Sequence, residues 1–404
     1  MSLKKNIVNL FGTQLISYVI PLLQLPYLSR VLDTDKFGLY IFSLSLLSIC
    51  NIISNYGFEL SIPKKIASEK INIKKLSIFI SAINYIKTVL IIFLILTTVL
   101  INIQNNYFDK LTLVFIIISI ISNGYNLIWL YLGIEKIYIY SRIIFLSRLI
   151  SLISIFLFIK ENSDNNILYI IIAMQNFLST FICYYYLKRW KLKYLSFNLR
   201  RIKELAKEST EYFISRLGVS LYSTCGSFFI GIMSGSMHQV AIYGAAEQLY
   251  KAGVMVISSI STPLTPYMAR TKNFSTFFKI TFLSICMTLL GASIGFFWGD
   301  KIISIIYSDE LIEAFPVLKI FMITIIVSIL GIHFGYPALI PLNKEKCANY
   351  SVLYAGLFQL LAISVFYLLN INITAVLIAI SYLLCDSLMF LYRISIFYVN
   401  YKKR

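Results

Sequence analysis

Six charged residues stand inside long apolar stretches of the sequence, where they could hold an ion or an anionic group. They are Lys87, Arg148, Glu247, Lys251 and Asp386 near the middle of their stretches and Arg142 somewhat nearer an end. A Lys or Arg at the centre of a membrane helix costs roughly 2.5–3.5 kcal/mol on insertion scales, so it tends to face a watery cavity or a partner. The cations outnumber the acids, and a positive cavity suits a phosphate or pyrophosphate, which Arg can hold with two parallel hydrogen bonds.

Some of these charges have a candidate partner on their own helix. Glu247 and Lys251 are four residues apart and could neutralise each other. Asp386 shares a helix face with Arg393, about 10 Å away along the axis, so the two could border one wall without touching.

Lys87 and Arg148 have no acidic neighbour on their own helices, which leaves a partner on another helix or a ligand. Charges closer to helix ends, namely Glu59, Arg216, Lys319 and Arg393, are explained by side chains that reach the membrane interface.

The stretches that carry these residues are long enough to cross a membrane. The chain has 404 residues, of which 58% are hydrophobic, and its mean hydropathy is +0.79. Runs of about twenty apolar residues span a hydrocarbon core about 30 Å thick, and without water such runs must be helical. The alternation typical of an outer-membrane barrel is absent. We therefore predict an all-α integral membrane protein with about twelve spanning helices, at residues 7–32, 37–58, 78–101, 111–133, 137–159, 167–187, 212–235, 240–264, 279–298, 315–340, 350–369 and 374–399.

Basic residues are distributed unevenly between the loops. With the N-terminus inside, the cytoplasmic segments and their borders hold 24 Lys and Arg, and the opposite loops hold 5. Because an excess of Lys and Arg in short loops fixes orientation, both termini are predicted to be cytoplasmic. The most basic stretch, residues 188–211, is predicted to be a cytoplasmic linker loop. It would join an N-terminal six-helix bundle, residues 1–187, to a C-terminal one, residues 212–404.

Signatures of several other functions are missing from the sequence. There is no GxxxxGK[ST] motif for ATP. His238 and His333 are the only histidines, and the six cysteines show no CxxC spacing, which argues against a metal centre. No nucleophile–base pair stands out, so we predict neither an enzyme nor a bound cofactor. The net charge of +18 is explained by loop cations that orient the chain and contact anionic lipid, and no nucleic acid is predicted as a partner.

The N-terminal part of the sequence carries a recognisable pattern. It consists of LPYLSRVLDTDKFGLYIFSLS, residues 25–45, followed by NYGFELSIPKKIA, residues 55–67. These stretches resemble the opening of the bacterial O-antigen and capsule repeat-unit flippases, which belong to the multidrug/oligosaccharidyl-lipid/polysaccharide exporter superfamily. The residues that fit the family pattern are Arg30, Phe37, Gly38, Tyr56, Gly57 and Phe58.

The resemblance implies two six-helix bundles around a central cationic cavity. The cargo would be an oligosaccharide on undecaprenyl pyrophosphate, moved across the bacterial inner membrane by alternating access. Partners would be this lipid-linked oligosaccharide, membrane lipids, and the polymerase and chain-length regulator of O-antigen, lipopolysaccharide or capsule synthesis. By depth and charge we assign substrate binding to Lys87, Arg142, Arg148 and Lys251. The matched motif adds Arg30, whose place at a helix end also fits an orienting role.

Transport without an ATPase motif suggests coupling to an ion gradient or the membrane potential, with Glu247 and Asp386 as the titratable groups. One alternative is a drug/cation antiporter of the same fold, which would favour an acidic, aromatic cavity, whereas this interior leans positive. Another is a membrane glycan polymerase or acyltransferase. Such enzymes usually need a large external loop or intramembrane His and Asp chemistry, and the longest external loop, residues 299–314, is short.

Overall fold

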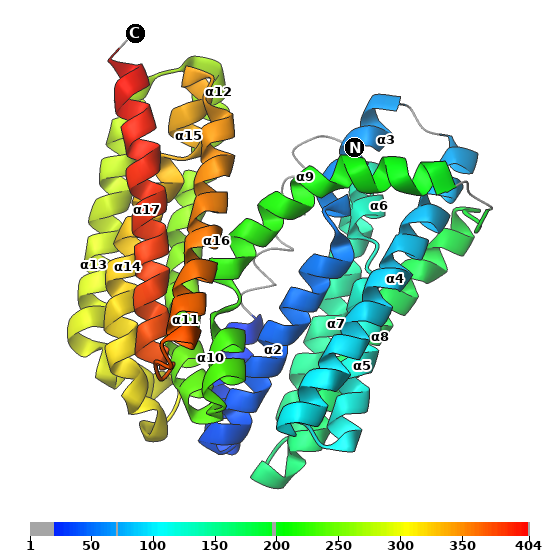
Figure 1. The fold of residues 1–404 in the computed structure, drawn as a ribbon, viewed down its shortest axis with the longest axis horizontal. Helices are drawn as coiled ribbons and strands as arrows, with labels where there is room; N and C mark the ends of the chain where they lie inside the picture. Colours follow the sequence, from blue (N-terminus) through cyan, green and yellow to red (C-terminus); the bar gives the residue numbers. More distant parts are fainter. Residues whose placement is uncertain (1–19, 70–71, 196–198, 403–404) are drawn as a thin grey trace. The chain divides into compact units, whose positions relative to one another are not determined.

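The computed structural model describes residues 20–69, 72–195 and 199–402, and over these ranges the chain is helical and contains no β-strand. It divides into two compact units (Figure 1). Unit 1 comprises Met1–Leu32 and Leu46–Leu217, and unit 2 comprises Asp33–Ser45 and Gly218–Arg404. The chain passes from one unit to the other directly before α2 (Thr34–Asn55), again within α2, and finally within α9 (Leu199–Ser223).

The predicted all-α membrane fold is confirmed. Nine helical segments of the described residues are long and apolar enough to span a membrane, and a tenth is the pair α9 and α10, which is bent by 63°. These ten correspond to ten of the twelve predicted spans. The eighth predicted span is a continuous helix, α11 (Met237–Ser261), but its polar and charged side chains keep it out of this apolar set. Of the first, only residues 20–32 lie in the described ranges, and residues 20–31 are helical.

Unit 1 is built from long helices joined by short breaks (Figure 1). After the end of α2, its elements are α3 (Phe58–Glu69), α4 (Ile73–Asn105), α5 (Lys110–Gly124), α6 (Ile128–Gly133), α7 (Ile137–Phe158), η1 (Asn162–Asp164), α8 (Asn165–Arg189) and the first part of α9. Its core combines aliphatic and aromatic side chains, and the rings of Phe79, Trp129 and Tyr131 in it are fully buried. Asn72 caps α4 by accepting a hydrogen bond from the Lys75 amide, 2.9 Å away, as expected of Asn at this position.

Unit 2 follows the same plan (Figure 1). After the start of α2 and the end of α9, its elements are α10 (Gly226–Ser234), α11, α12 (Leu264–Thr271), α13 (Phe274–Ile306), η2 (Asp309–Ala314), α14 (Phe315–His333), α15 (Tyr336–Leu339), η3 (Ile340–Leu342), α16 (Glu345–Leu368) and α17 (Ala375–Tyr401). Helices α14 and α17 pack against each other, α13 packs against α14, and α16 packs against α17. One core cluster of this unit gathers Phe277, Phe334 and Phe397.

Residues 188–211 were predicted to form a loop, and this prediction is wrong for most of the stretch, which is helical. Helix α8 continues to Arg189, and α9 begins at Leu199. Helix α9 forms because one face is apolar, with Leu205 fully buried, while the exposed face carries Arg200 and Glu204 as an i,i+4 ion pair at 3.2 Å. The high charge of the stretch therefore marks an amphipathic helix.

Helix α9 packs closely against the break between α2 and α3 (Figure 1). The chain turns there through Tyr56 and Gly57, which both adopt positive φ angles, 44° and 74°. The Tyr56 ring stacks on Phe213 with centroids 4.5 Å apart, and the hydroxyls of Ser61 and Ser209 are hydrogen-bonded at 2.7 Å. The Tyr-Gly pair of the sequence motif therefore forms the turn against which α9 packs.

Replacing Gly57 with alanine is expected to destabilise the protein by roughly 2–4 kcal/mol, the sum of a left-handed backbone and an overpacked contact. A Cβ at this position would lie 2.7 Å from the Ser209 carbonyl oxygen and 2.7 Å from the Phe213 amide nitrogen, so the α9 backbone must move. The measurement is the thermal unfolding midpoint of the purified protein in detergent. Gly291→Ala is the matched control, because a Cβ there meets nothing within 4 Å. Equal midpoints for the two variants would contradict the packing described here.

Candidate functional site

In unit 1, Lys87 is the centre of a buried polar network. It lies on α4 with no exposed surface. Its ammonium donates to the carbonyl oxygen of Asn126 at 2.7 Å and to the side-chain oxygen of Asn55 at 3.3 Å. The Asn126 amide in turn donates to the Tyr140 hydroxyl at 2.8 Å. We call Asn55, Lys87, Asn126 and Tyr140 the lysine network.

The lysine network joins two breaks in the helices. Asn55 is the last residue of α2, and Asn126 lies between α5 and α6. Carbonyls at such breaks lose their helical partners, and in a membrane they need another donor. The buried ammonium meets that need at Asn126, so the cation and the broken helix stabilise each other.

Two further charges lie close to the lysine network. Glu59, in the first turn of α3, is within electrostatic range of Lys87, and Tyr140 is within range of both Glu59 and Arg148. A small cavity of about 40 Å³ borders Asn55, Glu59 and Arg216. A space of this size admits water but no larger ligand.

Sequence reasoning did not find the neutral members of this site. Asn55, Asn126 and Tyr140 carry no charge, and nothing in their local pattern distinguishes them from other polar residues in helices. The one available signal was position, since Asn55 directly precedes the Tyr56–Gly57–Phe58 motif. Glu59 and Arg216 were explained as interface residues, whereas the structure places both beside the network.

The arginines predicted to bind substrate lie on unit 1 in different settings. Arg148, on α7, is partly buried, and its Nη1 atom has no hydrogen-bond partner among the described residues. Arg142, six residues earlier, is exposed, and its guanidinium carbon Cζ lies 5.8 Å from the centroid of the Tyr138 ring. Arg30 is exposed near the end of the helix at residues 20–31. Of the three, Arg148 is the one with a buried donor still to be satisfied.

In unit 2, Glu247 and Lys251 form an ion pair on α11. The Lys251 ammonium lies 2.8 Å from one carboxylate oxygen of Glu247. The other oxygen, Oε1, is buried and has no partner among the described residues. Glu247 is buried, while the Lys251 side chain is partly exposed. The two charges therefore pair, as their spacing of four residues allows, and Glu247 Oε1 remains a buried acceptor without a partner among the described residues.

Reversing both charges of this pair tests whether neutralisation is its role. We expect Glu247→Lys with Lys251→Glu to accumulate as folded protein close to the wild-type level, because the opposite charges still meet. Each single reversal places two like charges four residues apart inside the membrane, and should lower the folded yield several-fold. Folded yield is measured as the monodisperse fraction after detergent extraction. A double variant no better than the single ones would mean that each position needs its own charge.

Asp386 lies in a second buried network of unit 2. Its carboxylate accepts a hydrogen bond from Ser328 on α14, and the Ser328 and Tyr250 hydroxyls are 2.7 Å apart. Arg393, on the same helix as Asp386, does not reach the interface as predicted: it is buried and donates to Ser351 at 2.8 Å and to the Gly331 carbonyl at 2.6 Å. The two charges therefore contact different groups, as their seven-residue spacing suggested.

Comparison with known proteins gives a consistent picture. Residues 3–272 match the family described as polysaccharide biosynthesis protein. A protein of Escherichia coli (strain K12) named "Putative O-antigen transporter" is 26% identical over 275 residues, 67% of this chain and 66% of that protein, slightly under two thirds of its length. A protein of the same name from Shigella dysenteriae is 26% identical over 378 residues, 89% of this chain and 91% of its own.

Two solved structures share the fold. The lipid II flippase MurJ, in an inward closed conformation, superposes with a TM-score of 0.76 at 13% identity, over 96% of this chain and 87% of that one. An inward-facing multidrug resistance MATE family transporter of the MOP superfamily gives 0.70 at 12% identity, over 98% and 99% of the two chains. At these identities the likeness establishes the architecture of a multi-pass membrane protein and leaves the substrate open.

Proposed function

Because the chain belongs to the polysaccharide biosynthesis protein family, we propose that it is a flippase for lipid-linked oligosaccharides. Its substrate would be an oligosaccharide repeat unit on undecaprenyl pyrophosphate, carried across the bacterial inner membrane by alternating access. The names of its relatives, which give O-antigen transport, support this substrate class. The flippase and transporter folds of MurJ and MATE support the transport mode.

The observation that carries the proposal is the buried Nη1 atom of Arg148, which has no hydrogen-bond partner among the described residues. A buried N–H group without an acceptor costs about 1–3 kcal/mol, and more when it is charged. Its persistence in a membrane helix is explained if an anionic ligand supplies the acceptor during transport. The pyrophosphate of the substrate has the oxygens and the charge that a guanidinium binds best.

The other predicted site residues have different roles in this proposal, according to their exposure. Arg142 and Lys251 are partly or fully exposed and would contact the anionic group directly. Lys87 is shielded, so it would act through the positive potential that it supplies. Arg30 would orient its helix or guide the headgroup. Glu247, with its open oxygen, and Asp386, bonded to Ser328, are proposed to bind the coupling ion.

The orientation and the wider context are part of the same proposal. Both termini would lie in the cytoplasm, following the distribution of basic residues. Two six-helix bundles, residues 1–187 and 212–404, would alternate in access, with residues 188–211 linking them. The polymerase and chain-length regulator that use the delivered repeat units would be functional partners. The protein itself would catalyse no covalent step.

A reconstituted transport assay tests the proposal. The protein is placed in liposomes that contain a fluorescent undecaprenyl-pyrophosphate-linked oligosaccharide, and the fraction exposed to a membrane-impermeant quencher is followed in time. We expect the protein to speed the exchange between leaflets, and an ion gradient to bias it. Ethidium transport without lipid exchange would instead identify a drug antiporter. Longer glycan products would identify a polymerase. Either result would overturn the proposal.

A further inference from the structure

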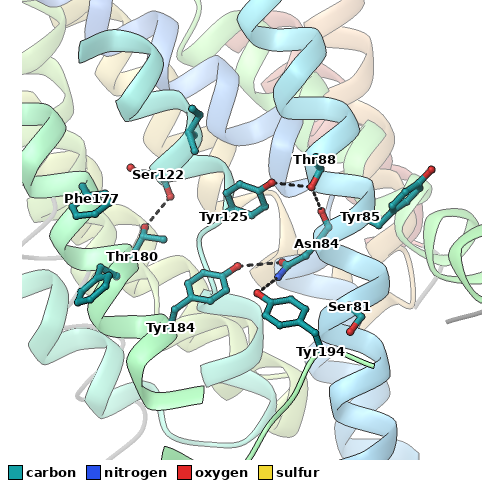
Figure 2. Close-up of a pocket in the computed structure, with 12 residues that line it drawn as sticks. Ser81, Asn84, Tyr85, Thr88, Ser122, Tyr125, Phe177, Thr180, Tyr184 and Tyr194 are labelled. Atoms are coloured by element: carbon teal, nitrogen blue, oxygen red, sulfur yellow. Dashed lines mark hydrogen bonds between the residues drawn. The ribbon is translucent and has the colours of Figure 1, made fainter. Parts of the chain in front are cut away.

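Unit 1 contains a groove between its long apolar helices that the proposed transport does not use. Its main chamber, about 570 Å³, lies between α4, α5 and α8 (Figure 2). A second chamber of about 170 Å³ shares Tyr184 and Tyr194 with the first and reaches Lys188 and Lys193. We call the two chambers together the tyrosine groove. Among the residues that the structure describes, no charged side chain lines the main chamber, so Lys188 and Lys193 place the charge of the groove at one end.

The groove changes in chemistry along its length. The α8 residues that line the groove include Phe177, Phe181, Tyr184 and Lys188, whose spacing of four, three and four keeps them on one helix face; Thr180 and Leu187 lie beside them. This stripe is about 16 Å long. It passes from apolar rings, through a phenol, to an ammonium. An amphiphile with an anionic head and an apolar tail matches this order.

Hydrogen bonds hold the middle of the groove in a fixed arrangement (Figure 2). The Tyr184 hydroxyl donates to the side-chain oxygen of Asn84 at 3.2 Å, and the Asn84 amide donates to the Tyr194 hydroxyl at 3.0 Å. Asn84 is only 7% exposed, so its side chain is a built part of the wall. Because the Tyr194 oxygen accepts from Asn84, its own proton can be donated to a ligand.

Hydrogen bonds from the turn after α8 to α4 hold the Tyr194 hydroxyl in place. The backbone amides of Lys193 and Leu195 donate to Ser77 and Ser81 at 3.2 and 2.9 Å. Burial also raises the pKa of the Tyr194 phenol, so it remains a neutral donor at physiological pH. Among the described residues, neither Lys188 nor Lys193 takes part in an ion pair. Their charges are thus available to an anion.

We propose that the tyrosine groove binds an anionic glycerophospholipid, with its phosphate at Lys188 and Lys193 and its ester carbonyls at the Tyr194 hydroxyl. Tyr184 is one turn below Lys188, about 6 Å along the helix, and the ester groups of a phospholipid lie a comparable distance below its phosphate. The acyl chains would follow Phe177 and Phe181.

The polar middle of the groove distinguishes this ligand from a polyprenyl phosphate. A polyprenyl chain has no polar atom below its phosphate, so it would leave the Tyr194 donor facing hydrocarbon, which is unfavourable. Ester carbonyls are acceptors and complement a donor. Such a site is independent of the transported substrate, and its occupancy is measured without any transport assay.

Native mass spectrometry of the detergent-purified protein measures the binding of dioleoyl phosphatidylglycerol. Surface lysines contribute about 1 kcal/mol each to anionic lipid binding, or about fivefold in affinity. We therefore expect Lys188→Gln with Lys193→Gln to weaken the tightest site about 25-fold. The matched control is Arg189→Gln with Lys191→Gln, which removes two neighbouring exposed charges outside the groove and should leave the affinity unchanged.

Two further comparisons test the assignment of the ester group. Tyr194→Phe should weaken binding of the ester lipid about fivefold, the effect of one lost hydrogen bond, and should not affect its dialkyl ether analogue. The ether lipid should bind the wild-type protein correspondingly more weakly, a result that requires no variant. Equal losses in the lysine and control pairs would overturn the proposal, as would equal affinity for phosphatidylcholine. If undecaprenyl phosphate displaces the phospholipid and binds Tyr194→Phe undiminished, the groove holds the polyprenyl lipid instead.

Discussion

Replacing Arg148 with methionine should reduce lipid exchange at least about 30-fold while leaving the protein at least as stable as the wild type. Removing one partner of a buried charged contact costs 2 kcal/mol or more in binding, and about 2 kcal/mol corresponds to this factor. The stability half of the expectation follows from the unsatisfied Nη1 atom of Arg148. An apolar side chain removes a buried donor that makes no hydrogen bond within the described protein, so the unfolding midpoint should stay the same or rise.

The charge series at Arg148 separates contact from general electrostatics. Arg148→Lys keeps the charge but loses the planar pair of donors, so it should retain part of the exchange rate. Arg148→Glu would repel a pyrophosphate and should be the least active variant. Arg189→Met, at an exposed site at the end of α8, controls for loss of a cation. Wild-type exchange by Arg148→Glu would rule out the proposed contact. A lower unfolding midpoint for Arg148→Met would mean that the residue has a structural role instead.

Replacing Lys87 with glutamate should leave almost no folded protein. The carboxylate would face the Asn126 carbonyl oxygen and the Asn55 side-chain oxygen, both of which accept from the ammonium in the wild type. It would also lie within range of Glu59. A buried charge without compensation costs about 3–5 kcal/mol, a large part of the stability of a typical domain. The measurement is the yield of monodisperse protein after detergent extraction.

Two companion variants make the Lys87 result interpretable. Lys64→Glu makes the same charge change at an exposed site on α3 and should be tolerated. Lys87→Met keeps most of the side-chain volume, so enough folded protein should remain for transport measurements. If Lys87 supplies positive potential to the substrate, this variant should exchange lipid more slowly even after correction for folded protein. A normal folded yield of Lys87→Glu would contradict the hydrogen bonds that the Lys87 ammonium donates in the lysine network.

The helical class of this protein, most of its membrane spans and the family pattern at Tyr56–Gly57–Phe58 were predictable from sequence alone. These features depend on local information. A run of apolar residues must become a helix in a membrane whatever its neighbours are, because its backbone groups have no other partner. Short-range geometry also sufficed for the Glu247–Lys251 pair, since residues four apart on a helix meet regardless of tertiary structure.

Only the tertiary structure decided which charges are satisfied and by what. Lys87 meets Asn55, 32 residues away, and Asn126, 39 residues away, and neither neutral residue carries a local signal for this contact. The tyrosine groove likewise combines α4, α5, α8 and the turn at Tyr194. Hydropathy registers how apolar a segment is, but a buried polar group is stabilised by whichever donor or acceptor the packing brings to it. These contacts form between different helices, and the spacing of residues along the chain does not predict which residues meet there.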